Sequence, residues 1–183
     1  MKFKIILVLV FFYAGLVSAA DAPPVEQSLG EYKVNIYSDG SGYFGRPSEM
    51  AVVDNHWSFY GRDEMTDKLQ NEAYRMGQFE SMGRTFTAPL GLKVIVNSKA
   101  AQKICVVGHD FPGRTAMFRV DSNQAITTNT SGCALLTKQI DRQLRGGKVA
   151  KVQGVEWPDG ADKIAVVNLD GYAELTDWLR NRR

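Results

Sequence analysis

The sequence predicts an α+β fold that is rich in mainly antiparallel strands, forming a sandwich or barrel-like sheet with two or three flanking helices. Short segments of β-branched and aromatic residues recur along the chain. The connections between them are short and polar or contain glycine, which favours antiparallel neighbours. Fewer segments carry apolar residues at helical spacing. No internal repeat or low-complexity tract occurs, so residues 31–183 are expected to form a single globular domain.

Residues 1–20 have the order of a secretory signal peptide. Lys2 and Lys4 precede a short apolar run, and small side chains follow as far as Ala20. The run is shorter than the roughly 20 apolar residues of a membrane-spanning helix. We therefore expect cleavage after Ala19 or Ala20, no membrane span afterwards, and a periplasmic or secreted protein. An uncleaved membrane anchor is the alternative.

Removal of this segment would change the net charge of the protein. The chain has 22 basic and 20 acidic residues, and the first twenty residues contain two lysines and no acid. The processed protein would therefore be balanced between the two signs of charge. Such a protein lacks the overall basic charge that binding to a phosphate backbone requires, so we expect no nucleic-acid partner.

The first half of the processed chain is expected to contain few regular elements. Residues 21–30 contain two prolines and are typical of a flexible leader. Alternation predicts one strand over residues 32–37 and another around residues 56–60. From Asp63 onward four apolar residues recur at helical spacing, which predicts a helix. These four residues are Met65, Leu69, Ala73 and Met76.

The second half is more regular. Three strands are predicted over residues 90–96, 103–107 and 114–120, because these segments are rich in β-branched and other apolar residues. A helix follows residue 133, where apolar side chains recur every four residues: Leu136, Ile140 and Leu144.

A β-hairpin and a final helix complete the prediction. Residues 148–157 and 163–169 flank the sequence Pro158-Asp159-Gly160, in which proline presets one turn dihedral and glycine permits a positive one. Asp170 can cap a helix whose apolar face docks on the core. This face consists of Tyr172, Leu175, Trp178 and Leu179.

Cys105 and Cys133 are the two cysteines of the chain. In an oxidising compartment such a pair usually forms a disulfide. Closing the loop between them would stabilise the protein by roughly 3 kcal/mol. A reduced catalytic thiol is the alternative.

Histidine, the usual acid–base residue, occurs only as His56 and His109. His109 would lie on the same face of a strand as Cys105, but about 13 Å away at roughly 3.3 Å for each residue. That separation exceeds the hydrogen-bond reach of nucleophilic catalysis. We therefore expect His109 to bond the loop that contains Phe111. No metal-ligand or cofactor motif occurs, so we expect no metal and no cofactor.

Aromatic residues gather among glycines and polar residues between positions 37 and 62. Aromatic side chains in a loop-rich segment suit a recognition surface, because they offer a large contact area at low entropic cost. They also suit a plug that closes a β-core, and both interpretations stay open. Together with the histidine loop, the candidate binding surface comprises Tyr37, Tyr43, Phe44, Trp57, Tyr60, His109 and Phe111.

The segment from Leu90 to the end of the chain resembles the invasion-associated locus B family of bacterial exported proteins. The residues that carry the resemblance are Pro89-Leu90-Gly91-Leu92, Lys103-Ile104-Cys105-Val106-Val107, Met117-Phe118-Arg119-Val120-Asp121, Gly132-Cys133-Ala134, Leu144-Arg145-Gly146-Gly147-Lys148 and Val167-Asn168-Leu169-Asp170-Gly171-Tyr172. The resemblance implies a non-enzymatic envelope protein, connected with host interaction or envelope maintenance, and it supplies no catalytic residues.

We therefore expect an exported binding or interaction protein of the bacterial envelope, whose partner is another protein or an envelope component. Two alternatives remain. One is an inhibitor or immunity-type protein that blocks an envelope-directed hydrolase with a rigid loop, Ser38–Arg46 or Asp110–Arg114. The other is a small hydrolase that uses His56 or His109 with a nearby carboxylate.

Overall fold

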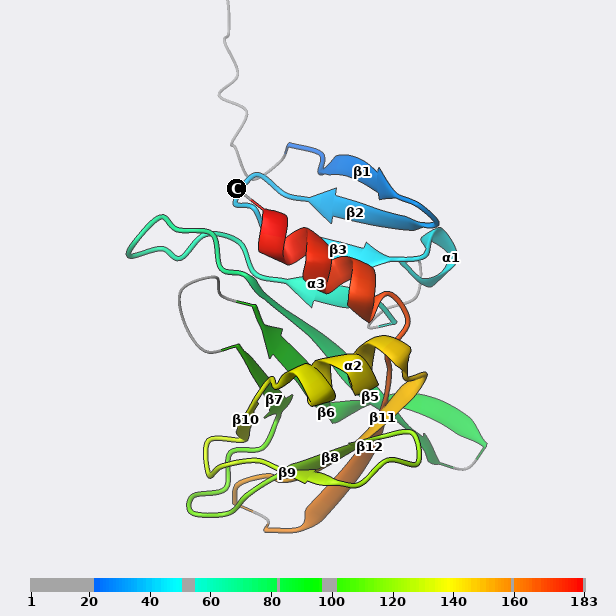
Figure 1. The fold of residues 1–183 in the computed structure, drawn as a ribbon, viewed down its shortest axis with the longest axis vertical. Coiled ribbons are helices and arrows are strands. Elements are labelled where there is room, and N and C mark those ends of the chain that lie inside the picture. Colours follow the sequence, from blue (N-terminus) through cyan, green and yellow to red (C-terminus); the bar gives the residue numbers. More distant parts are fainter. Residues whose placement is uncertain (1–21, 51–54, 82, 97–101, 159, 183) are drawn as a thin grey trace, which may run out of the picture.

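The computed structural model describes residues 22–50, 55–81, 83–96, 102–158 and 160–182 (Figure 1). The predicted signal peptide, residues 1–20, lies outside the described residues. In chain order the elements are β1 (Val25–Leu29), β2 (Tyr32–Ile36), β3 (Gly42–Gly45), α1 (Pro47–Met50), β4 (Trp57–Phe59), β5 (Glu72–Ser81), β6 (Arg84–Ile95), β7 (Lys103–Val107), β8 (Met117–Val120), β9 (Ile126–Thr127), β10 (Cys133–Leu135), α2 (Lys138–Gly146), β11 (Val149–Val155), β12 (Asp162–Asn168) and α3 (Tyr172–Asn181).

The strands form one sheet that is not closed into a barrel. Its main path runs β1-β2-β3-β4-β5-β12-β11-β8-β9, and β6 branches from β5 to carry β7 and then β10. Every strand pairing among the described residues is antiparallel. The predicted α+β class with mainly antiparallel strands is therefore confirmed.

Strand β5 joins two parts of the molecule. Its residues Ala73 and Tyr74 pair with β4, whereas Gln78, beyond an irregularity in the β5–β6 register, pairs with Val166 of β12. We call the first part, with β1–β4 and α3, the upper part, and the second, with β8, β9, β11, β12 and α2, the lower part (Figure 1). A single long strand thus carries both.

The two longer helices cover one side of the sheet (Figure 1). Helix α3 packs against β3 and β4, where the rings of Tyr172 and Trp57 lie 5.9 Å apart and those of Trp178 and Phe59 lie 4.9 Å apart. Arg145 of α2 pairs with Asp177 of α3 at 2.7 Å, so the helices also bind each other. The core lies between these helices and the sheet. Neither of the two helices covers the opposite face of the upper part (Figure 1).

Several predicted elements are confirmed. The strands predicted over residues 32–37, 56–60, 103–107 and 114–120 all occur, with ends that differ by at most three residues. The strand predicted over residues 90–96 also occurs, but β6 begins earlier, at Arg84. The helix predicted after residue 133 begins only at Lys138, so Leu136 lies outside it and strand β10 precedes it. The hairpin occurs as β11 and β12, which pair over seven residues each. The final helix also forms, but its N-cap position is Gly171 with φ 75° and no side-chain capping bond. Asp170 therefore does not cap it.

Two further predictions are wrong. Part of the expected flexible leader over residues 21–30 forms strand β1, which pairs with β2 along its whole length. The expected helix after Asp63 does not form, because the side chain of Asp63 accepts the backbone N–H groups of Met65 and Thr66 in a local turn. Asp67 then adopts a left-handed φ of 54°, which a helix does not allow. Met65 is 92% exposed, and the chain resumes as strand β5.

Candidate interaction surface

Strand alternation divides the predicted aromatic surface into two groups. Neighbouring residues of a strand point to opposite faces, so Tyr43 and Phe44 of β3 separate. Phe44 and Trp57 are completely buried in the core. Their assignment to a binding surface is wrong, because they face α3. Tyr37, Tyr43 and Tyr60 are 38%, 37% and 39% exposed, and they remain on the surface.

The exposed tyrosines lie on the uncovered face of the upper part. The strand register places Tyr43 opposite Ser58 and Ser58 opposite Tyr74, so these residues form one row across β3, β4 and β5. The ring centroids of Tyr37 and Tyr43 are 5.8 Å apart, and those of Tyr60 and Tyr74 are 5.5 Å apart. Tyr74 itself is half-buried. We call Tyr37, Tyr43, Tyr60 and Tyr74 the tyrosine face.

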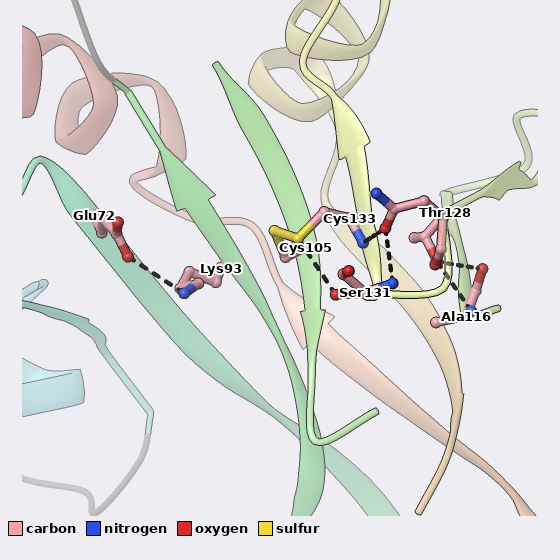
Figure 2. Close-up of a disulfide and its surroundings, with 8 residues drawn as sticks. Glu72, Lys93, Cys105, Ala116, Thr128, Ser131 and Cys133 are labelled. Atoms are coloured by element: carbon pink, nitrogen blue, oxygen red, sulfur yellow. Dashed lines mark hydrogen bonds and ion pairs between the residues drawn. A yellow bond between two sulfur atoms is a disulfide. The ribbon is translucent and has the colours of Figure 1, made fainter. Parts of the chain in front are cut away.

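Charged and ring partners hold the tyrosine face in place. Lys93 of β6 lies opposite Tyr74, and its Nζ is 5.9 Å from the centre of the Tyr60 ring. The same Nζ pairs with Glu72 at 3.3 Å (Figure 2). The ring of His56 lies 4.5 Å from that of Tyr43. These contacts restrict the rings, which lowers the entropy that a partner must remove on binding.

The disulfide extends the same row of residues. Lys93 lies opposite Cys105, and Cys105 lies opposite Cys133. The two cysteines form the predicted disulfide between β7 and β10 (Figure 2). Cys105 is only 4% exposed, so both the bond and the burial remove it as a catalytic thiol.

Side-chain hydrogen bonds fix the loop that leads into β10. The Asn129 side chain accepts the backbone N–H groups of Ser131 at 3.0 Å and Cys133 at 2.9 Å. The hydroxyl of Thr128 bonds both the N–H and the carbonyl of Ala116, each at 2.9 Å (Figure 2). The loop that carries Cys133 is therefore attached to the segment that leads into β8.

A buried arginine supports the tyrosine face from the other side of the sheet. Arg75 follows Tyr74 in β5, so it points inward, where it is 1% exposed. Its guanidinium donates to the carbonyl of Asp170 at 3.2 Å and to the carbonyl of Asn55 at 2.7 Å. It also lies 3.7 Å from the carboxylate of Glu49. The Arg75 guanidinium therefore has a structural role in the core.

Asp170 connects the sheet to the start of α3. Its carbonyl also accepts the indole N–H of Trp57 at 3.0 Å, and its carboxylate accepts bonds from Tyr32 at 3.0 Å and Arg46 at 2.8 Å. Burial and the hydrogen bond to Asp170 raise the pKa of Tyr32 to about 12. These contacts, and not capping of α3, hold the Asp170 side chain in place.

His109 has a structural role. Its Nδ1 accepts the N–H of Val155 at 3.1 Å, so the ring proton is on Nε2, which donates to the carbonyl of Arg114 at 3.1 Å. Both nitrogens therefore bond backbone groups rather than a carboxylate. His109 is 9% exposed, and its assignment to the binding surface is wrong because it ties a loop to β11.

The loop around Phe111 is rigid and partly exposed. Asp110 accepts the N–H of Trp157 at 2.7 Å, and the rings of Phe111 and Trp157 lie 5.3 Å apart. Trp157 is 58% exposed at the end of the β11–β12 hairpin. Phe111 thus belongs to a second aromatic site, in the lower part and separate from the tyrosine face.

The second predicted loop, Ser38–Arg46, is not a free loop. Residues from Gly42 onward form β3, and the preceding turn is closed by a bond from the Tyr37 N–H to the Ser41 carbonyl at 2.8 Å. Arg182, which follows α3, donates to the carbonyl of Gly40. The segment is therefore attached to the end of α3.

Tyr74 was not predictable as a surface residue from the apolar pattern. Its strand has the inward sequence Ala73, Arg75 and Gly77, in which an arginine occupies a core position. Because a charged residue occupies the inward position at the centre of this strand, the alternation of apolar and polar residues is lost there. The helical spacing of Met65, Leu69, Ala73 and Met76 therefore determined the prediction. The aromatic and β-strand propensity of Tyr74 was the available signal.

Metal-ligand clusters and membrane-spanning helices are both missing from the part of the chain that the structure describes. It contains no cluster of three or more metal-binding side chains. None of its helices has the length and apolar character needed to cross a membrane.

Three comparisons with known proteins find no match. No family model, no curated protein and no solved structure is significantly similar to the chain. The functional inference therefore rests on the geometry of the tyrosine face and of the aromatic site formed by Phe111 and Trp157.

Proposed function

We propose that this chain is an exported, non-enzymatic binding protein of the bacterial envelope that recognises another protein or an envelope component through the tyrosine face. The tyrosine face is the observation that carries the proposal. Exposed, restrained tyrosines on an uncovered sheet face are suited to protein contacts, since they bury a large area with little loss of side-chain freedom. A catalytic role has less support, because both ring nitrogens of His109 are engaged by backbone groups.

Export is supported by three features. The first twenty residues have the order of a signal peptide, the two cysteines are bonded, and the resemblance of the second half is to exported envelope proteins. Mass spectrometry of the protein recovered from outside the cytoplasm should give an N-terminus at Ala20 or Asp21. Recovery of the chain with Met1 intact would contradict cleavage.

Affinity capture with a matched variant tests the binding role. The wild-type protein should retain its partner from an envelope extract, and the double variant Tyr43→Ser/Tyr60→Ser should lose it. Each exposed tyrosine at a binding hot spot contributes roughly 1–2 kcal/mol, so the loss should exceed about tenfold in affinity. Trp157→Ser removes an exposed aromatic ring elsewhere and should retain the partner. Equal capture by all three proteins would reject the tyrosine face.

A second candidate function is inhibition of an envelope-directed hydrolase. The observation that favours it is the rigid pair of loops bearing Phe111 and Trp157, because inhibitors present a preformed loop to a partner's cleft. In this case the pattern of the same experiment reverses. Trp157→Ser would abolish capture, and Tyr43→Ser/Tyr60→Ser would leave it unchanged.

A further inference from the structure

A second exposed sheet face lies in the lower part, on β8, β11 and β12. Here Met117 lies opposite Gln153, which lies opposite Ile164. In the next row Arg119 lies opposite Lys151, which lies opposite Val166. We call these six residues the basic face. Met117, Ile164 and Val166 are 36%, 61% and 37% exposed, so apolar surface adjoins the two cations.

The two cations of the basic face have no counter-ion among the described residues. Neither Arg119 nor Lys151 forms an ion pair or a side-chain hydrogen bond with any residue that the structure describes. They are directly opposite each other on neighbouring strands, where like charges destabilise a sheet. Such a pair reduces the stability of the free protein, and an anionic group bound between the two cations would remove the repulsion.

Two hollows in the surface are lined by residues of β12. One hollow, of about 240 Å³, has a lining that includes Met117, Arg119, Ala125, Lys151, Gln153 and Ile164. A second hollow, of about 320 Å³, is lined by Phe79, Ala88, Pro89, Leu90, Lys163 and Ile164. The second hollow does not continue the first, because Lys163 and Phe79 lie on the opposite face of the sheet from Ile164. Only the first hollow adjoins the two cations, and Met117 and Ile164 contribute apolar surface to it.

The width of the first hollow fits a short extended peptide. Its lining runs from Ile164 of β12 across β11 to Met117 of β8, which is two strand spacings or about 10 Å. About three residues of extended chain cover this distance at roughly 3.3 Å each. An apolar side chain of such a segment would contact Met117 and Ile164, and a carboxylate would bind between Arg119 and Lys151.

We propose that the basic face binds an extended segment of a partner protein in which an acidic residue lies next to apolar residues. The site is separate from the tyrosine face and goes beyond the function proposed above. A lipid bilayer fits the shape less well, because a flat anionic surface cannot enter a hollow. The overall charge balance of the chain after residue 20 also gives no general attraction to anionic surfaces.

A library of displayed peptides tests this proposal before any natural partner is identified. Peptides about seven residues long, selected on the disulfide-bonded protein, should be enriched in aspartate or glutamate beside apolar residues. Synthetic copies should bind more weakly as salt is added, because the contact depends on charge. Recovery of no peptide, or of peptides without an acidic residue, would overturn the proposal.

Charge-reversal variants locate the binding site. Arg119→Glu and Lys151→Glu should each weaken the selected peptides by about tenfold or more. Lys103→Glu, which reverses an exposed cation on β7, is the matched control and should leave binding unchanged. Arg119→Glu also replaces the repulsion with an attraction to Lys151, so its melting temperature should be at least that of the wild type. Weaker binding by a protein of undiminished stability cannot be attributed to misfolding.

The remaining outcomes also decide the question. Equal binding by Arg119→Glu and Lys103→Glu would reject the basic face. Vesicles of phosphatidylglycerol and phosphatidylcholine are the last probe, and wild-type protein should not bind them. If the vesicles bind in an Arg119-dependent way and the peptides do not, the surface recognises lipid and the peptide proposal is wrong.

Discussion

The tyrosine face and the basic face belong to one sheet, yet their cations differ in the partners that surround them. On the tyrosine face Lys93 pairs with Glu72 and contacts the ring of Tyr60. On the basic face Arg119 and Lys151 have no partner among the described residues. The charge of the first face is satisfied by these described contacts, and that of the second is not.

This difference indicates what each face can recognise. A surface whose charges are paired binds mainly through contact area, so the tyrosine rings determine its affinity. A surface with unpaired like charges gains most from a ligand of opposite sign. We therefore expect the two faces to differ in salt dependence, with weak dependence for the tyrosine face and strong dependence for the basic face.

The largest effect should come from Arg75, the buried cation beneath the tyrosine face. Arg75→Ala removes its bonds to Asp170 and Asn55 and leaves Glu49 without its cation. Loss of one partner from a buried ion pair costs about 3 kcal/mol or more. Urea denaturation measures this cost. Arg119→Ala, which removes an exposed cation, is the control and should leave the free energy of unfolding unchanged. Equal losses in the two variants would contradict the distinction between the buried and the exposed cation.

The disulfide, which lies at the end of the row of residues that contains Tyr74 and Lys93, should have the next largest effect on stability. Cys105→Ser/Cys133→Ser releases a constraint between residues 28 positions apart. The expected loss is about 3 kcal/mol. Reduction of the wild-type protein should give a similar loss in the same denaturation measurement. A variant as stable as the wild type would mean that the bond contributes little beyond what the β7–β10 pairing supplies.

Alkaline pH should affect the upper part through Tyr32. Its pKa is raised from 10.0 to about 12 in the folded protein, so folding favours the protonated phenol. That contribution to stability is complete below pH 10 and is lost as the pH rises through about 12. Denaturation curves across this interval should fall less steeply for Tyr32→Phe. Identical slopes would show that the Tyr32–Asp170 bond does not couple to folding.

The smallest effect is expected on the basic face. Arg119→Glu changes a repulsion across two strands into an attraction, so it should raise the free energy of unfolding by about 0.2–1 kcal/mol. Thermal and urea denaturation against Lys103→Glu measure this gain. A loss of stability in Arg119→Glu would mean that the two like charges are already well solvated or paired, and the contrast between the faces would disappear.

Local sequence pattern predicted much of the fold. Alternating residues predicted β2, and richness in β-branched and other apolar residues predicted β7 and β8. The proline–glycine turn predicted the β11–β12 hairpin. The expected helix after Asp63 failed because a side-chain-stabilised turn and the left-handed Asp67 outweigh apolar spacing. A tertiary contact explains the other failure, since strand β1 of the expected leader forms only where β2 is available for pairing.

The candidate surfaces were less predictable than the fold. Tyr37, Tyr43 and Tyr60 were found from their aromatic character, but nothing local separated them from Phe44 and Trp57. The register between strands decides that separation, and it depends on residues distant in the sequence. The pairing of Arg119 with Lys151 likewise arises only when β8 and β11 are placed side by side.

Protection of the tyrosine face in an envelope extract tests the central claim most directly. Hydroxyl-radical labelling followed by mass spectrometry reports the solvent access of individual tyrosines. We predict that Tyr43 and Tyr60 are labelled in buffer and protected in the extract, while the buried Phe44 and Trp57 stay unlabelled in both. Unchanged labelling of Tyr43 and Tyr60 in the extract would contradict a binding role for this face.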